Sequence, residues 1–95
     1  MASGRKMNFY MTGGIAADME NDGMFAAQVA NAIHSFTEND WGVMDGEDFK
    51  VNVEAMKNGG SVMGVYPTKH GRIWIINDDA HAAEMTVTVL YPSEY

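Results

Sequence analysis

Three strand-like segments follow one another in the last third of the sequence, with only short turns between them. They span residues 61–66, 72–77 and 85–91, and the last one opens with strict alternation of apolar residues and threonine. Turns this short cannot carry a crossover connection, so neighbouring segments must pair in antiparallel orientation. The chain is therefore restricted to folds built on a C-terminal β-meander. The outward-facing Thr86 and Thr88 mark the last segment as a candidate sheet edge.

Two segments earlier in the chain show helical periodicity. Residues 24–37 repeat apolar side chains at helical spacing, and Asn21 or Asp22 can cap this helix. Residues 46–57 form the second predicted helix, which Asp45 can cap. Both helices should cover one face of the sheet. Three apolar residues share one side of the second helix: Phe49, Val53 and Met56.

The remaining segments complete the expected fold. Residues 8–12 are compatible with a short strand, residues 15–19 with a helical turn or loop, and residues 1–6 with a flexible terminus. A chain of 95 residues supports a single core. We therefore predict one α+β domain over residues 1–95, in which two helices pack on an antiparallel sheet of three to four strands.

Composition narrows the setting and the chemistry. The chain has no cysteine, which excludes disulfide bonds and thiolate zinc sites and favours the cytoplasm. No signal peptide and no segment of membrane-spanning length is recognisable. Nine methionines accompany a single leucine. The methionines either replace leucine in the core or, at Met19, Met24 or Met44, form an adaptable binding surface.

Charge is distributed unevenly along the chain. The formal net charge of −7 disfavours direct binding to nucleic acid. No Lys or Arg occurs between Met7 and Phe49. The same stretch carries these acids: Asp18, Glu20, Asp22, Glu38, Asp40, Asp45, Glu47 and Asp48. They either keep the protein soluble or form a negative face that steers it onto a basic partner.

Trp41 lies among these acids, in the segment Glu38-Asn39-Asp40-Trp41-Gly42. As an exposed loop residue, Trp41 would anchor a contact with a basic pocket that has an apolar floor. Alternatively, Trp41 folds back and fills the joint between the two helices. The sequence leaves both interpretations open.

No catalytic or metal-binding pattern is recognisable. No two of the histidines, His34, His70 and His81, are close in sequence, whereas catalytic zinc sites usually include a pair of ligands at helical spacing. The cluster of Asp78, Asp79, His81 and Glu84 could bind a cation weakly, but a polar turn explains it as well. The serines lack a nucleophile-elbow context, and the glycine pairs lack the Lys and Ser or Thr of a phosphate loop. We therefore expect no enzymatic activity, no cofactor and no bound metal.

Several short segments from Asp40 onward form a recognisable pattern. The pattern consists of Asp40-Trp41-Gly42, Glu47-Asp48, Asn52, Glu54-Ala55, Gly59-Gly60, Arg72-Ile73-Trp74-Ile75-Ile76 and Pro92-Ser93-Glu94-Tyr95. It resembles a group of small uncharacterised proteins carried by bacterial mobile elements and phages. The chain departs from this group at residues 77–81, where such relatives carry a Glu and an Arg. The resemblance implies a mobile-element origin, a bacterial host cell and no known catalysis.

These features lead to two leading hypotheses, besides a third in which a small enzyme or metal protein uses the region of His81. The first is a non-enzymatic acidic inhibitor that mimics nucleic acid and occupies the basic groove of a host protein, as an anti-CRISPR or other anti-defence protein. The eight acids would then be the charged contacts, with Trp41 as the anchor. The second is a self-associating structural or regulatory module of a mobile element, in which residues 85–91 pair between the two copies of a homodimer.

Overall fold

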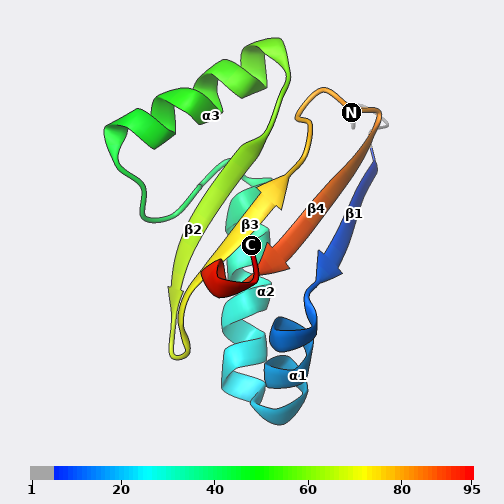
Figure 1. The fold of residues 1–95 in the computed structure, drawn as a ribbon, viewed down its shortest axis with the longest axis vertical. Helices are drawn as coiled ribbons and strands as arrows, with labels where there is room; N and C mark the ends of the chain where they lie inside the picture. The colour runs from blue at the N-terminus through cyan, green and yellow to red at the C-terminus, as the bar shows by residue number, and fades with distance from the viewer. Residues whose placement is uncertain (1–5) are drawn as a thin grey trace.

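A four-stranded mixed sheet organises residues 6–95, the part of the chain that the computed structural model describes (Figure 1). The strands lie in the order β1-β4-β3-β2, accompanied by three α-helices and a short 3₁₀ helix. In chain order the elements are β1 (Lys6–Met11), α1 (Gly13–Asn21), α2 (Gly23–Thr37), α3 (Gly46–Asn58), β2 (Val62–Thr68), β3 (Gly71–Asn77), β4 (Glu84–Leu90) and η1 (Pro92–Glu94). The α+β class and the single sheet agree with the sequence prediction.

The C-terminal strands form the predicted antiparallel meander. β2 pairs with β3 and β3 with β4, both antiparallel. The tight turn between β2 and β3 ends at Gly71, whose φ of 95° is one that residues with a side chain rarely adopt.

The expectation of a fully antiparallel sheet is wrong for β1, which pairs in parallel with β4. Three helices and two strands separate β1 from β4 in the chain, and a connection that long allows parallel pairing. Because β1 occupies the outer side of β4, the prediction that residues 85–91 form a sheet edge is also wrong. The edge strands are β1 and β2.

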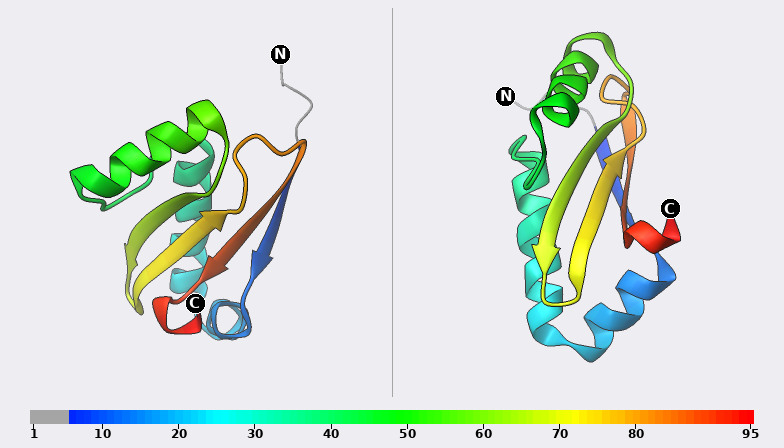
Figure 2. Two further views of the ribbon diagram at one scale, coloured as in Figure 1. Left: turned by 45° about the horizontal axis from the view of Figure 1, so that its top comes forward. Right: turned by 60° about the vertical axis from the view of Figure 1, so that its left-hand side comes forward.

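The core lies between the sheet and α2, which covers one face of it (Figure 2, right). Phe25 and Val29 of α2 are fully buried, as are Ile75, Val87 and Val89 on the facing strands. Burying each such side chain contributes about 1.5–3 kcal/mol before the cost of ordering is counted. The helix begins where the sequence predicts, because the Asp22 carboxylate accepts hydrogen bonds from the backbone N–H groups of residues 24 and 25.

The helical turn or loop predicted at residues 15–19 is a complete helix, so the structure has three α-helices rather than two. Ile15 of α1 is fully buried. The Glu94 carboxylate, from the other end of the chain, accepts a 3.0 Å hydrogen bond from the Gly14 N–H and a 2.6 Å bond from the Thr12 hydroxyl. A carboxylate at a helix N-terminus satisfies free N–H groups and favours the helix dipole. The stabilising group is therefore remote from α1 in sequence.

The third helix, α3, lies beside the β2 edge instead of covering the sheet face. Asp45 caps it as predicted, by accepting from the Asp48 N–H at 2.9 Å. Its buried residues are Asn52 and Ala55. The Asn52 amide donates to the Met63 carbonyl at 2.8 Å and accepts from the Met63 N–H at 3.1 Å, so the polar side chain sets which side of the helix faces β2.

The segment before α3 closes the outer edge of β2. The Val65 N–H donates to the Trp41 carbonyl at 2.9 Å, and the Val43 N–H donates to the Val65 carbonyl at 2.8 Å. Gly42, between them, has a φ of 76° and lies so near Val65 that a Cβ would collide with the carbonyl oxygen. Residues 41–43 and Asn52 therefore occupy backbone groups that an edge strand would otherwise expose.

Candidate functional site

The acids predicted to form one negative face are distributed over the molecule. They fall into three groups along the fold: Asp18, Glu20 and Asp22 on α1 and before α2, Glu38 and Asp40 after α2, and Asp45, Glu47 and Asp48 at the start of α3. Helices α1 and α3 lie at opposite ends of the molecule (Figure 1). The carboxylates therefore do not converge on a single patch.

Two of these acids are the N-caps of helices. Asp22 caps α2 and also contacts the Lys69 ammonium and the His70 ring, each at 3.0 Å. Hydrogen bonds from Lys69 and His70 hold the pKa of the Asp22 carboxyl well below its usual range. Asp45 caps α3. Both carboxylates thus have structural partners that compete with any external ligand.

Two further acids contact tyrosines. Asp18 accepts a hydrogen bond from the Tyr91 hydroxyl. Burial, and then this bond, raise the pKa of Tyr91. The Asp40 carboxylate accepts a hydrogen bond from the Gly42 N–H at 3.1 Å. The backbone carbonyl of Asp40 accepts one from the Tyr66 hydroxyl at 2.8 Å. The exposed acids of the predicted set that remain are Glu20, Glu38, Glu47 and Asp48.

Trp41 is buried, with 7% of its surface exposed. Its ring packs edge to face on Phe49 of α3, with the ring centroids 5.4 Å apart. Of the two interpretations that the sequence left open, the structure shows the second, in which Trp41 fills a joint with a helix. The prediction of Trp41 as an exposed anchor is wrong for this conformation.

The side of α3 that carries Phe49, Val53 and Met56 is only half covered. These residues recur at i, i+4 and i+7 and are 52%, 42% and 41% exposed. We call them the α3 stripe. Sequence periodicity correctly places them on one side of the helix but misses their exposure, because the buried side is set by Asn52 and Ala55. An asparagine and an alanine three residues apart do not indicate a buried helix face in the sequence.

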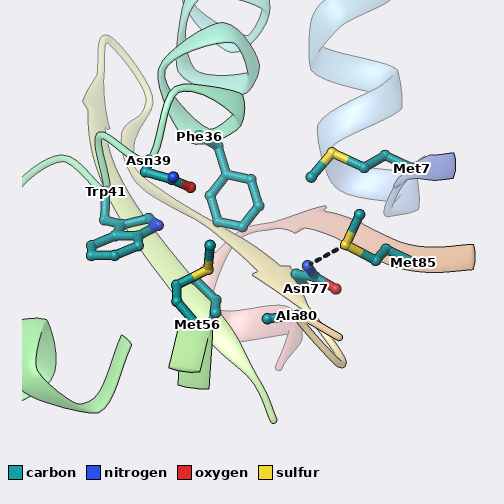
Figure 3. A pocket seen from close by; sticks show the side chains of 9 residues that line it. Met7, Phe36, Asn39, Trp41, Met56, Asn77, Ala80 and Met85 are labelled. Atoms are coloured by element: carbon teal, nitrogen blue, oxygen red, sulfur yellow. Dashed lines mark hydrogen bonds between the residues drawn. The ribbon is translucent and has the colours of Figure 1, made fainter. Parts of the chain in front are cut away.

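The α3 stripe adjoins a small cavity of about 110 Å³, shown in Figure 3. Met56 and Trp41 belong to its wall, so the cavity and the stripe share a border. The remaining lining residues are Met7, Phe36, Asn39, Val62, Asn77, Ala80 and Met85. None of these side chains titrates, so the cavity suits an apolar group and not acid–base chemistry.

Of the methionines considered for an adaptable surface, Met24 is 70% exposed, whereas Met19 and Met44 pack against the core. Met56, in the α3 stripe, is the methionine that combines exposure with a cavity wall. An unbranched thioether there can adapt to the shape of a bound group.

The polar groups around His81 hold a turn together. The Asp79 carboxylate accepts from the backbone N–H groups of Gly60 and His81, at 3.2 and 2.9 Å. A ring nitrogen of His81 lies 2.8 Å from the Met56 carbonyl oxygen. Within residues 6–95, no three acidic or histidine side chains gather in a way that could hold a metal ion.

Among the helices of residues 6–95, none combines the length and the apolar character needed to cross a membrane. Comparisons of the chain with protein-family models, with curated proteins and with solved structures found no match. The exposed α3 stripe, its adjoining cavity and the excess of acids over residues 38–57 are the features that support a functional proposal.

Proposed function

We propose that the protein is a non-enzymatic inhibitor that binds a basic host protein through the α3 stripe. The proposed partner is a nucleic-acid-handling protein of the bacterial host cytoplasm, and the role is that of an anti-CRISPR or other anti-defence protein. The observation that carries the proposal is the half-exposed stripe Phe49-Val53-Met56 beside an apolar cavity.

The apolar part of the surface supports binding of a protein rather than a small polar ligand. Side chains at i, i+4 and i+7 are the anchors with which a helix enters a partner's groove. The stripe leaves 52% of Phe49, 42% of Val53 and 41% of Met56 in contact with solvent. Covering that remaining surface contributes about 1 kcal/mol for each residue. The cavity next to Met56 has room for one apolar side chain of the partner.

The net charge of the segment that carries the stripe supports a basic partner. Residues 38–57 carry six acids (Glu38, Asp40, Asp45, Glu47, Asp48 and Glu54) against two lysines (Lys50 and Lys57). Excess negative charge speeds association with a positive surface and disfavours acidic competitors. Proteins that bind single-stranded nucleic acid have basic grooves with aromatic floors, so an apolar stripe on a segment of net negative charge complements them.

A nuclease inhibition assay tests the proposal directly. Purified RNA-guided nucleases, each loaded with its guide RNA, are mixed with increasing amounts of the protein, and DNA cleavage and binding are measured. We expect the wild type to inhibit at least one nuclease. Val53→Asp should weaken inhibition about tenfold or more, because it removes an apolar contact and adds a desolvated charge.

Val51→Asp is the matched control. Val51 is 59% exposed and lies on the other side of α3, so the same change in the same helix should leave inhibition intact. Circular dichroism verifies that both variants fold. Equal losses from Val51→Asp and Val53→Asp would reject the α3 stripe as the contact. A wild type that neither binds nor inhibits any nuclease of the panel would reject the function.

A further inference from the structure

The two edges of the sheet differ in whether other parts of the chain cover them. The β2 edge is covered by residues 41–43 and by Asn52. Strand β1 lies at the opposite edge, and Figure 1 and the left view of Figure 2 show no other element of the described chain beyond it. An edge strand of this kind offers a row of backbone groups to another strand.

The hydrogen bonds of β1 identify which of its backbone groups face outward. The Lys6 N–H donates to the Ala83 carbonyl at 3.1 Å, and the Thr12 N–H donates to the Val89 carbonyl at 3.0 Å. Because N–H and C=O groups alternate between the two sides of a strand, the even-numbered residues of β1 face β4. The odd-numbered residues, Met7, Phe9 and Met11, therefore direct their N–H and C=O groups away from the sheet.

Charge also favours a second copy at this edge. The protein carries a net charge of −7, which opposes self-association over most of its surface. The stretch from Met7 to Ala17 carries no charged residue, and Lys6 precedes it. Two copies can therefore approach through β1 without bringing carboxylates of β1 face to face.

We propose that two copies of this chain form a symmetric dimer by antiparallel pairing of β1 with β1, centred on Phe9. A two-fold axis beside Phe9 places it opposite the second copy's Phe9 and places Met7 opposite the second copy's Met11. All three residues are the outward-facing ones. This register therefore satisfies the N–H and C=O groups of each of them on both chains.

The side chains suit this register on both faces. The odd-numbered residues are apolar and lie on the side of the core, so pairing extends the apolar layer across the two copies. On the opposite face, Tyr10 comes to lie against the second copy's Asn8. Tyr10 is 55% exposed in the single chain, and the dimer would cover its ring.

Light scattering coupled to size exclusion measures the mass directly. We expect twice the 10.4 kDa of one chain at high concentration. Asn8→Lys combined with Tyr10→Lys should halve the measured mass, because each new lysine lies opposite a lysine of the second copy. The matched control is Thr86→Lys with Thr88→Lys, which adds the same charge to the same sheet face on the interior strand β4 and should leave the dimer intact.

Engineered cysteines test the register, since the natural chain has none. Asn8 and the second copy's Tyr10 would form a non-hydrogen-bonded pair with Cα atoms about 4.5 Å apart, which a disulfide can bridge. Asn8→Cys with Tyr10→Cys should give a covalent dimer on mild oxidation, and either change alone should not. Within one chain the two positions are about 6.6 Å apart along the strand, too far for their Cβ atoms to be bridged.

Each outcome decides the proposal independently of the nuclease assay. A wild type that stays monomeric at every concentration overturns it, as does a dimer that survives Asn8→Lys with Tyr10→Lys. Loss of the dimer in the β4 control would show that added charge alone prevents association and would overturn the assignment to β1. A covalent dimer from Asn8→Cys alone would overturn the Phe9-centred register.

Discussion

Glu94 acts at the scale of a single residue as a helix cap supplied from the far end of the chain. Its carboxylate accepts from the Thr12 hydroxyl, the Gly14 N–H and the Tyr91 N–H, at 2.6, 3.0 and 2.9 Å. The bond from Thr12, followed by the one from Tyr91, lowers the pKa of Glu94. A carboxyl whose pKa is lower in the folded state stabilises the fold above its unfolded pKa, and the stabilisation is lost as the pH falls through the folded pKa.

We therefore predict that Glu94→Gln lowers the free energy of unfolding by about 1 kcal/mol at neutral pH, a value kept modest because the site is open to solvent. The difference from the wild type should shrink as the pH falls below the ordinary Glu pKa of 4.5. Urea unfolding at several pH values measures it. Glu20→Gln, at an exposed acid on α1, is the control and should have little effect. A pH-independent difference would contradict the assignment.

Gly42 carries a second prediction at this scale. Its φ of 76° disfavours any side chain, and a Cβ there would meet the Val65 carbonyl oxygen. Gly42→Ala should therefore cost at least about 2 kcal/mol of stability, from left-handed strain and the clash together. Gly46→Ala is the control, since a Cβ at Gly46 meets nothing within 4 Å. Thermal unfolding of the two variants should differ in melting temperature, and equal values would contradict the closed edge.

At the scale of the element, α3 is held to β2 by a polar side chain. Asn52→Leu removes both hydrogen bonds to Met63. The backbone N–H and C=O of Met63 then lose the side chain that binds them. We predict a loss of about 2–4 kcal/mol in the free energy of unfolding and faster amide exchange at Met63. Asn58→Leu, at an exposed position of the same helix, should change neither quantity markedly. Slow exchange at Met63 in Asn52→Leu would show that the helix is held by other contacts.

The elements differ in how far the sequence predicts them, and the reason is the distance between interacting residues. The caps at Asp22 and Asp45 and the short turns of the meander are predictable because the signals lie within a few residues. The start of α1 depends on Glu94, 80 residues from Gly14, and the buried side of α3 depends on Met63. No periodicity in the sequence reports such contacts.

The candidate site was predictable only in part for a related reason. The sequence shows that acids dominate the first half of the chain, but not that they divide among three places in the fold. Trp41 carried no local signal for its burial, because its contact is with Phe49 across a turn. The α3 stripe is exposed because the hydrogen bonds between Asn52 and Met63 turn a different side of the helix toward β2.

At the scale of the whole molecule, the net charge should govern how fast the proposed partner is bound. Neutralising Glu38 and Glu47 with glutamine should lower the association rate and flatten its dependence on salt, because Glu47 belongs to α3 and Glu38 to the acidic segment that leads into it. Asp18→Asn with Glu20→Gln removes the same charge from α1, at the opposite end of the molecule (Figure 1), and should have a smaller effect on the rate. Stopped-flow binding at several salt concentrations compares them. Equal effects would mean that only total charge matters.

The proposed dimer and the proposed function together predict bivalent binding. The α3 stripe lies by the β2 edge and β1 lies at the other edge, so pairing through β1 leaves both stripes free at opposite ends. Asn8→Lys with Tyr10→Lys should bind a partner in solution as tightly per site as the wild type, yet dissociate faster from a surface densely coated with partner. Equal dissociation from the surface would contradict simultaneous engagement of both sites.

The closed edge of β2 also determines how large such an assembly can grow. Among residues 6–95, the backbone of β2 is already engaged by residues 41–43 and Asn52, so a third chain finds no free strand on which to stack. Joining two copies through β1 consumes the remaining edge of each. In the proposed dimer the sheet would therefore terminate at two subunits and be protected from open-ended polymerisation into fibrils, a hazard that a small sheet with two bare edges would carry.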